Sequence, residues 1–285
     1  MGIRIITDSA CDITQAEAKE LGITVIPLKT IFGTEEFRDG VDISHREFYE
    51  KLIETDVNPT TSQIGPAEYE DAFRTAVEAG DEVVCITVSS RLSGCFQSAT
   101  IAAAEFESKI TLVDSLNVAI GMRILVQLAL QARDEGKSAA EIGALLEAQK
   151  GDIRLIALVD TLESLKRGGR LSSAAAFAGT LLGIKPVIAI VEGEVAVLGK
   201  ARGSKNDSNM LMKLVEQSGI DFSRPFALAY SGLDDSLLRK YIADSAALYE
   251  GKAETLPVYT IGSTIGTHAG PGAIALAFFG KNKVS

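Results

Sequence analysis

Two kinds of hydrophobic pattern alternate along the first half of the chain. Short runs of branched apolar residues are typical of buried strands, whereas apolar residues that recur every three or four positions indicate helices. The runs predict strands at residues 3–7, 23–27, 82–88 and 109–113. The helical spacing predicts helices at residues 15–20, 44–54, 66–79, 94–105, 119–135 and 139–149. This alternation predicts a parallel sheet built from βαβ units, with helices on both of its faces.

Two of these helices carry a recognisable first turn. Ser44 and Glu47 have the spacing of a capping box, in which a hydroxyl and a carboxylate satisfy the free amides at the start of a helix. Pro66 stands in the first turn of its helix, where the missing amide hydrogen is not needed. These signals predict where the helices at residues 44–54 and 66–79 begin.

The pattern changes near Gly151. Residues 185–191 and 195–200 predict two strands joined by the tight turn Glu192-Gly193-Glu194, which indicates an antiparallel hairpin. Further strands are predicted at residues 152–159, 226–230 and 255–261, and helices at residues 161–167, 206–218 and 235–249. We therefore predict an α/β fold of two domains with a ligand site between them. Residues 1–151 form a parallel α/β domain, and residues 152–285 form a domain with a mixed sheet and helices.

Composition and charge narrow the class of protein. The 285 residues are 46% hydrophobic and carry a formal net charge of -10. This charge repels nucleic acid and anionic membrane surfaces, so we expect no nucleic-acid partner and only transient membrane contact. The start of the chain lacks the pattern of a signal peptide, and no apolar run reaches the ~18 residues of a membrane span. Cys11, Cys85 and Cys95 have no CxxC spacing and the chain has two histidines, so we expect a cytoplasmic protein without a metal site.

Four polar segments rich in Gly, Ser and Thr interrupt the apolar pattern. They are residues 60–63, 89–99, 166–172 and 262–272. In the second and fourth segments a strand ends, hydroxyl-bearing residues and glycines follow, and a helix begins. The free amides at a helix N-terminus, together with the positive end of the helix dipole, bind an oxyanion. Neighbouring hydroxyl groups and an imidazole add directional donors, so these segments predict a site for an oxyanion such as a carboxylate.

Each segment also has a simpler explanation when it is taken alone. Residues 60–63 could cap a helix, and Ser93 could do the same. Arg170, which follows paired glycines, could be an exposed surface cation. A packed core histidine rarely lies in a loop rich in glycine and proline, so His268 is the residue that most favours a functional role.

Motifs of common enzymes do not appear in the sequence. Gly136-Lys137-Ser138 is similar to the end of a phosphate-binding loop, but Gln131 stands where that loop requires a glycine. In residues 262–266 a serine follows the first glycine directly, whereas the serine of a hydrolase nucleophile elbow is central. The sequence therefore shows neither a nucleotide-binding motif nor a nucleophile motif.

Taken together, the polar segments resemble the DegV family, whose members include the fatty-acid-binding subunit of bacterial fatty acid kinase. The resemblance is carried by Thr7-Asp8-Ser9, Thr61-Ser62-Gln63, Ser90-Arg91-Leu92-Ser93-Gly94, Gly168-Gly169-Arg170-Leu171-Ser172 and Ile265-Gly266-Thr267-His268-Ala269-Gly270-Pro271-Gly272. It extends in family order over almost the whole chain. It implies a two-domain α/β fold shared with the substrate-binding subunit of dihydroxyacetone kinase. The acyl chain then lies in an apolar tunnel and its carboxylate lies between the domains, and no cofactor is implied besides this bound fatty acid.

The resemblance also implies roles for individual residues. The carboxylate ligands are then Thr61, Ser62, Ser93 and Gly94 from the first domain, and Thr267 and His268 from the second. Arg170 adds charge or orders the loop around the site. A separate ATP-binding kinase subunit phosphorylates the bound acid to an acyl phosphate, and the protein itself serves as a carrier. Arg202 and Lys205 lie in a segment that is basic in relatives, although Gly203 and Ser204 weaken the inference that it faces the kinase.

Candidate tunnel walls lie on the apolar residues 174–184. Phe177, Leu181 and Ile184 supply apolar contact there, between small residues that leave room beside a helix. Phe96 is a further candidate; together with Cys95 it replaces hydroxyl-bearing residues of many relatives, a departure that bears on acyl-chain selectivity. Without the resemblance, residues 174–184 could equally be an ordinary core helix.

Other functions also stay open. His268 could be the general base or nucleophile of a phosphoryl- or acyl-transfer enzyme. It could also hold a small carbonyl substrate, as in the dihydroxyacetone-binding relative, or the protein could bind its ligand without any kinase. The long apolar segment beside Arg170 favours a lipid over a small polar ligand.

Overall fold

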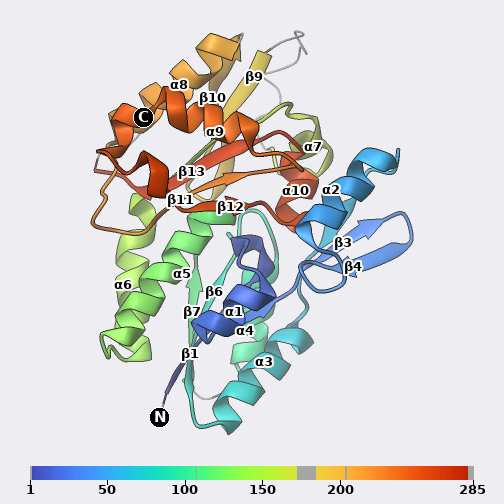
Figure 1. The fold of residues 1–285 in the computed structure, drawn as a ribbon. Helices are drawn as coiled ribbons and strands as arrows, with labels where there is room; N and C mark the ends of the chain where they lie inside the picture. Colours follow the sequence, from blue (N-terminus) through green and yellow to red (C-terminus); the bar gives the residue numbers. More distant parts are fainter. Residues whose placement is uncertain (1, 107, 172–183, 203, 282–285) are drawn as a thin grey trace.

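The first half of the chain forms the expected parallel sheet (Figure 1). The computed structural model describes residues 2–106, 108–171, 184–202 and 204–281. The first sheet has the strand order β2-β1-β6-β7, and all neighbouring strands are parallel. Its strands are β1 (Ile3–Asp8), β2 (Thr24–Ile26), β6 (Glu82–Thr87) and β7 (Ile110–Asp114). The sheet runs along the lower half of the molecule in Figure 1, and the parallel arrangement is confirmed.

Helices cover both faces of this sheet. The helices α3 (Pro66–Glu78) and α4 (Cys95–Ala103) pack side by side on one face. The other face is covered by α1 (Gln15–Leu21), α5 (Ala119–Asp134) and α6 (Ala139–Gln149). A capping box at Ser44 and Glu47 starts α2 (His45–Glu54), and Pro66 lies in the first turn of α3. Both predicted helix starts are therefore confirmed.

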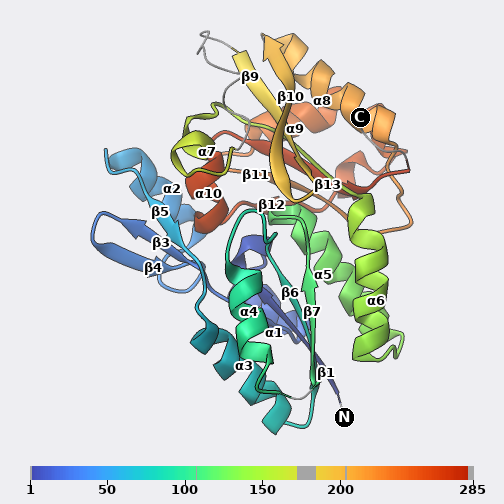
Figure 2. The ribbon, with the colours of Figure 1, turned by 180° about the vertical axis from the view of Figure 1, so that it is seen from behind.

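A small antiparallel sheet, which the sequence did not predict, projects from one side of the molecule (Figures 1 and 2). It has the order β4-β3-β5 and consists of β3 (Lys29–Phe32), β4 (Glu35–Arg38) and β5 (Thr60–Ser62). Helix α2 packs against it through a cluster that contains Phe32, Phe48 and Tyr49. The interpretation of residues 60–63 as a helix cap is wrong, because residues 60–62 pair with β3 and Gly65 is the N-cap of α3.

The second sheet is mixed, as expected. Its order is β10-β9-β8-β13-β11-β12, and all neighbours are antiparallel except β11 and β12. The strands are β8 (Ile153–Leu158), β9 (Ile184–Val191), β10 (Glu194–Arg202), β11 (Phe226–Tyr230), β12 (Val258–Thr260) and β13 (Ile274–Phe279). The hairpin of β9 and β10 is confirmed. The sequence analysis missed β13, which lies in the middle of the sheet between β8 and β11.

One helix of the second half is shorter than predicted. α8 (Ser204–Ser218) and α9 (Ser236–Asp244) pack on the outer face of the second sheet, at the top of Figure 1. The predicted helix at residues 235–249 ends with α9 and continues as a separate 3-10 turn, η4 (Ala246–Tyr249). The other helical elements of the described residues are η1 (Ser9–Cys11), η2 (Lys150–Asp152), α7 (Glu163–Arg167), η5 (Ala253–Thr255) and α10 (Ser263–Ala269). In the described part of the chain, no helix has the length and apolar character needed to cross a bilayer.

Helix α5 lies between the two sheets (Figures 1 and 2). It contacts β1 of the first sheet and β8, β11 and β13 of the second, and most of its residues are buried. Arg123 of this helix is 1% exposed and forms an ion pair with Glu17 of α1. On its other side, the guanidinium lies 3.6 Å from the ring centre of Tyr259 on β12. The chain passes from one sheet to the other at η2, where the sequence predicts the domain boundary. A single cluster of buried apolar residues nevertheless continues from the first sheet through α5 to the second.

Candidate functional site

An apolar cavity lies where the carboxyl ends of the first sheet meet the inner face of the second. The space between the atoms of its walls is about 990 Å³, including the part that is open to solvent. Ala10, Leu28, Val88 and Val118 line it from the first half of the chain. From the second half, β8, β9, β10, β11 and β13 form its floor, and Leu165, Ile265 and Ala269 close it from the sides.

A row of alanines makes room for this cavity on the floor. Ala157 of β8, Ala275 of β13 and Ala229 of β11 are direct partners across the three strands, and all three line the cavity. Neighbouring strands lie about 4.8 Å apart, so the row spans ~10 Å. Because alanine has only a methyl group, the layer of side chains on the sheet is thin along this row. Larger side chains such as Leu155 and Ile188 project further into the cavity beside it. The row therefore forms a trough wide enough for a flexible hydrocarbon.

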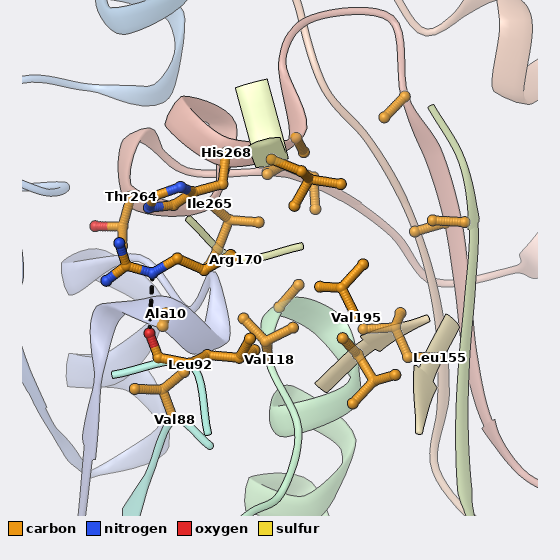
Figure 3. A pocket seen from close by; sticks show the side chains of 18 of the residues that line it. Ala10, Val88, Leu92, Val118, Leu155, Arg170, Val195, Thr264, Ile265 and His268 are labelled. Atoms are coloured by element: carbon orange, nitrogen blue, oxygen red, sulfur yellow. Dashed lines mark hydrogen bonds between the residues drawn. The ribbon is translucent and has the colours of Figure 1, made fainter. Parts of the chain in front are cut away.

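Polar groups gather at one end of the cavity. Figure 3 shows Arg170, Thr264 and His268 together at one side, while Leu155 and Val195 lie at the opposite side. Thr61, Gln63 and Ser93 also line the cavity and are its other polar residues in the described part of the chain. The cavity thus has a polar end and an apolar end, which is the division expected for a ligand with a polar head and an apolar tail.

His268 lies on helix α10 and not in a loop, because residues 263–269 are helical. Its Nε2 is 2.8 Å from Oγ1 of Thr61 on β5, so the imidazole connects the second half of the chain to the small sheet. Gly168 allows the ring to approach α7, since a Cβ atom there would lie 2.3 Å from Nδ1 of His268. Nδ1 is buried and has no hydrogen-bond partner among the described residues.

Burial, and then the nearby charge of Arg170, lower the pKa of His268 to about 4 from 6.5. The imidazole is therefore neutral at neutral pH, and one of its nitrogens can donate while the other accepts. The guanidinium of Arg170 is held in place by Nε, which donates to Leu92 O at 3.1 Å (Figure 3), and by Nη1, which donates to Gly168 O at 2.6 Å. Arg170 is only partly exposed, so the interpretation of it as a free surface cation is wrong.

The low pKa of His268 predicts a pH dependence of stability. Between pH 6.5 and about 4 the unfolded chain protonates this histidine while the folded protein keeps it neutral. The wild type should therefore lose stability relative to His268→Gln as the pH falls through this window, by at most about 1.4 kcal/mol per pH unit. Above pH 6.5 the difference should be constant. Urea unfolding of both proteins between pH 4.5 and 7.5 measures it, and a difference that does not change with pH would contradict the buried, neutral imidazole.

Ser93 reaches the cavity from the loop that follows β6. Its amide donates to Ser89 O at 3.1 Å, and its hydroxyl donates to Sγ of Cys95 at 3.2 Å, a weak acceptor that a ligand oxygen can replace. The N-cap of α4 is Gly94, so Ser93 does not cap this helix. Gly94 itself packs beside the cavity, because a Cβ atom there would lie 2.1 Å from Oε1 of Gln63.

Several residues singled out by the sequence lie away from the cavity. The side chain of Ser62 points to the other face of β5 from Thr61, and its hydroxyl donates to Gln63 O. The hydroxyl of Thr267 is buried and donates to Ser263 O in the preceding helical turn. Phe96 is half-buried and does not line the cavity. The structure thus separates Ser62, Thr267 and Phe96 from the polar end.

Most of the other predicted tunnel residues lie outside the described part of the chain. Phe177 and Leu181 lie outside the described residues, as does most of the segment 174–184. Ile184 begins β9, where its backbone pairs with Arg202 of β10. Lys205 lies near the start of α8.

The N-terminus of α10 does not offer free amides to a ligand, which corrects the expectation from the sequence. The amide of Gly262 donates to Asp12 Oδ1 at 2.8 Å, and the amides of Ser263 and Thr264 donate to Asp39 at 3.0 and 3.3 Å. Both carboxylates are buried, and burial raises the pKa of Asp12. The chain's own carboxylates thus occupy the position that an anionic ligand would take.

These contacts also show what the small sheet does for the site. Thr30 of β3 donates to the hydroxyl of Ser263 at 2.9 Å, and Asp39 follows β4 directly. Helix α2 packs so closely on α10 that a Cβ atom at Gly266 would lie 2.6 Å from Phe48 and Tyr49. The small sheet and α2 therefore fix the helix that carries Thr264 and His268.

Asp8 and Ser9, which belong to the Thr7-Asp8-Ser9 motif, hold in place the cavity wall formed by the first half of the chain. The carboxylate of Asp8 accepts hydrogen bonds from the amides of Ala10 and Val88 at 3.1 and 2.7 Å, and Ser9 Oγ accepts from the amide of Leu28 at 3.0 Å. Ala10, Leu28 and Val88 all line the cavity. Burial raises the pKa of Asp8 to about 7, despite these amide donors.

Sequence analysis missed Thr264 and the alanine row. A buried hydroxyl in the first turn of a helix looks like any other Thr, and the alanines are recognisable only once β8, β11 and β13 are known to be neighbours. Within the described residues, no group of three or more His, Cys, Asp or Glu side chains is placed to hold a metal ion.

The known proteins that the chain is similar to belong to one family. The family model described as "Uncharacterised protein, DegV family" matches residues 2–281. The DegV domain-containing proteins of Caldanaerobacter subterraneus subsp. tengcongensis and Deinococcus radiodurans are each 34% identical to the chain, over 97% of its length and 98% of theirs. A solved structure of a DegV family protein from Thermus thermophilus, described as binding fatty acid, is similar to the chain with a TM-score of 0.85 and 33% identity, over 98% of this chain and 100% of the other. DegV of Bacillus subtilis, described as a fatty acid binding protein, is similar with a TM-score of 0.82 and 30% identity, over 99% and 100%.

Proposed function

Because the chain belongs to the DegV family and its apolar cavity ends in a cluster of polar groups, we propose that the protein binds a long-chain fatty acid. The observation that carries this proposal is the division of the cavity into a polar and an apolar end (Figure 3). Two similar proteins of known structure, from Thermus thermophilus and Bacillus subtilis, are described as binding fatty acids.

The tail of the ligand is proposed to lie in the trough formed by Ala157, Ala229 and Ala275. Burial of about 14 methylenes contributes on the order of 11 kcal/mol, at ~0.8 kcal/mol each. Loss of translational freedom and ordering of the chain offset several kcal/mol or more of this gain. Apolar contact is therefore sufficient for tight binding, and the polar end needs only to fix the register of the head group.

The carboxylate is proposed to lie among Thr61, Ser93, His268 and Arg170. The hydroxyls and the guanidinium are donors that suit an acceptor-only group, and the neutral imidazole directs the Thr61 hydroxyl toward it by donating from Nε2 to Thr61 Oγ1. The net charge of -10 opposes an anion at long range, so these local donors have to outweigh it. A small carbonyl substrate, the alternative for His268, would leave the long apolar part of the cavity empty.

We further propose that the protein is a cytoplasmic carrier which presents this carboxylate to a separate ATP-binding kinase subunit for conversion to an acyl phosphate. The polar end supports this role because it reaches the surface, where Gln63 and Gly169 are exposed. The sequence shows no phosphate-binding loop, so the phosphate donor has to be bound by another chain. No part of this scheme requires a cofactor beyond the fatty acid, and any contact with a membrane during loading would be transient.

Extraction of the purified protein tests the ligand. After denaturation, mass spectrometry of the organic extract should detect close to one long-chain fatty acid per chain. Protein that is empty and also fails to bind added palmitate or oleate would refute the proposal, whereas protein that is empty but binds them would show only that the ligand was lost.

The carrier role has a separate test. At saturating fatty acid, Ser93→Ala and His268→Ala should reduce phosphorylation by the kinase about 100-fold or more, because the carboxylate is no longer held in register. The affinity for the fatty acid should fall less, by about the 10-fold that one hydrogen bond to a charged group contributes. Ser90→Ala, in the same loop but exposed, is the matched control. Complete loss of chain binding in both site variants would indicate instead that these residues maintain the fold.

A further inference from the structure

Thr264 has a hydroxyl group that the protein leaves unpaired. The residue is 4% exposed, and its Oγ1 has no hydrogen-bond partner among the described residues. Buried hydroxyl groups are nearly always hydrogen-bonded, so an unpaired one needs an explanation. Thr264 also lines the cavity at its polar end. The missing partner is therefore to be sought in the cavity.

The position of Thr264 in its helix explains why its hydroxyl is free. Threonine hydroxyls in helices commonly donate to the carbonyl four residues earlier, as Thr267 does to Ser263 O at 2.8 Å. Four residues before Thr264 stands Thr260, which ends β12 and precedes the helix. The usual internal acceptor is thus not available. At the same time Asp39 holds the amide of Thr264, which fixes the residue in this position.

Other donors surround this hydroxyl. Thr264 and His268 are four residues apart on α10, so their side chains lie on the same face of the helix. Figure 3 shows both next to the guanidinium of Arg170. Since Asp12 and Asp39 hold the amides of residues 262–264, the hydroxyl of Thr264 is the donor that this helix offers to an anion in the cavity.

We propose that Thr264 donates a hydrogen bond to the carboxylate of the bound fatty acid, a role that rests on the proposed function and extends it. Thr61 and Ser93 donate from the first half of the chain, and Thr264 donates from the second. The carboxylate is an acceptor for all three, whereas an ester is uncharged and an alcohol has a single oxygen. Thr264 thus makes the site selective for free fatty acids over their esters and alcohols.

A pair of isosteric variants tests this role. Thr264→Val keeps the shape of the side chain and removes the hydroxyl, and Thr264→Ser keeps the hydroxyl. The affinity of Thr264→Val for palmitate should fall about 10-fold or more, the effect of one hydrogen bond to a charged group. Its affinity for hexadecan-1-ol should change by less than about 3-fold, since that bond is weaker for a neutral head group. Thr264→Ser should restore most of the palmitate affinity.

Thr87 offers a matched control. It is fully buried in β6 and does not line the cavity, and its Oγ1 also has no hydrogen-bond partner in the part of the chain that the structure describes. Thr87→Val should therefore bind palmitate and hexadecan-1-ol as the wild type does. Thermal unfolding of the ligand-free variants checks that they fold, and removal of an unpaired buried hydroxyl should not lower their melting temperatures.

The outcomes separate the two proposals. A wild type that binds neither ligand refutes the proposed function. A wild type that binds palmitate, together with a Thr264→Val variant that binds it equally well, overturns only the role of Thr264. Equal weakening of both ligands in Thr264→Val would also overturn it, because the residue would then act through packing of the chain and not through the head group.

Discussion

Replacement of Ala275 by phenylalanine should lower the affinity for long-chain fatty acids about 100-fold while the protein stays folded. Ala275 lies in the middle of the alanine row, between Ala157 and Ala229 on the neighbouring strands. A benzyl group there would occupy the trough and displace about four methylenes of the ligand. At ~0.8 kcal/mol per methylene this loss is about 3 kcal/mol, which corresponds to the expected factor.

The same change is expected to have little effect on the ligand-free protein. In a close-packed core an added ring costs about 1–3 kcal/mol, but Ala275 faces existing space. Calorimetric titration with palmitate measures the affinity, and thermal unfolding followed by circular dichroism measures the fold. Val258→Phe is a suitable control, because Val258 is 39% exposed on β12 of the same sheet and does not line the cavity. Unchanged palmitate binding by Ala275→Phe would place the acyl chain elsewhere.

Arg123→Ala should lower the free energy of unfolding by about 3 kcal/mol or more. The guanidinium is 1% exposed, Nη1 donates to Glu17 at 2.7 Å, and its flat face contacts the ring of Tyr259. Truncation removes one partner of a largely buried ion pair and also leaves a cavity between α5 and the elements on both sides. Arg123→Met, which retains most of the volume, should be less destabilising than Arg123→Ala.

Arg133 on the same helix provides the comparison. Its ion pair with Asp134 is much more exposed, with 24% and 70% of the two side chains accessible, and its hydrogen bonds to Leu21 O are long, at 3.4 Å. Arg133→Ala should therefore cost about 1 kcal/mol or less. Urea unfolding of the three variants, with the slopes compared, gives these differences. If Arg123→Ala and Arg133→Ala prove equally mild, the buried ion pair contributes no more than a surface one.

The sequence predicted the elements whose signals are local. The capping box at Ser44 and Glu47 correctly marked the start of α2, and the turn at Gly193 marked the β9–β10 hairpin. The parallel first sheet followed from the regular alternation of strands and helices. In each of these cases the residues that determine the structure lie within a few positions of one another.

The errors concern elements whose partners are distant in sequence. Residues 274–279 form an unbroken apolar run that cannot be assigned from its pattern alone, and only its pairing with β8 and β11 makes β13 a central strand. Thr60 looked like a helix cap because its real partner, Ile31 of β3, is a residue of a short strand that carries little signal of its own. Such pairings depend on the tertiary structure.

The candidate site also depends on contacts between residues that are distant in sequence. The sequence singled out Thr61, Ser93, Arg170 and His268, and the structure brings them together around the polar end of one cavity. The free amides expected at the start of α10 are instead bonded to Asp12 and Asp39, which lie more than 200 positions earlier in the chain. No local pattern could reveal that the protein's own carboxylates occupy this helix end.

The position of α5 between the sheets has a consequence for folding. Each sheet needs a layer of side chains on its inner face, and α5 supplies that layer to both. A fragment that ends near Gly151 would keep α5, but the apolar face of α5 that packs on β8, β11 and β13 would be exposed to water. The other fragment would contain the second sheet without the helix that covers its inner face. Neither half can therefore be stable without the other. The chain should unfold as one cooperative unit, although its strands form separate sheets.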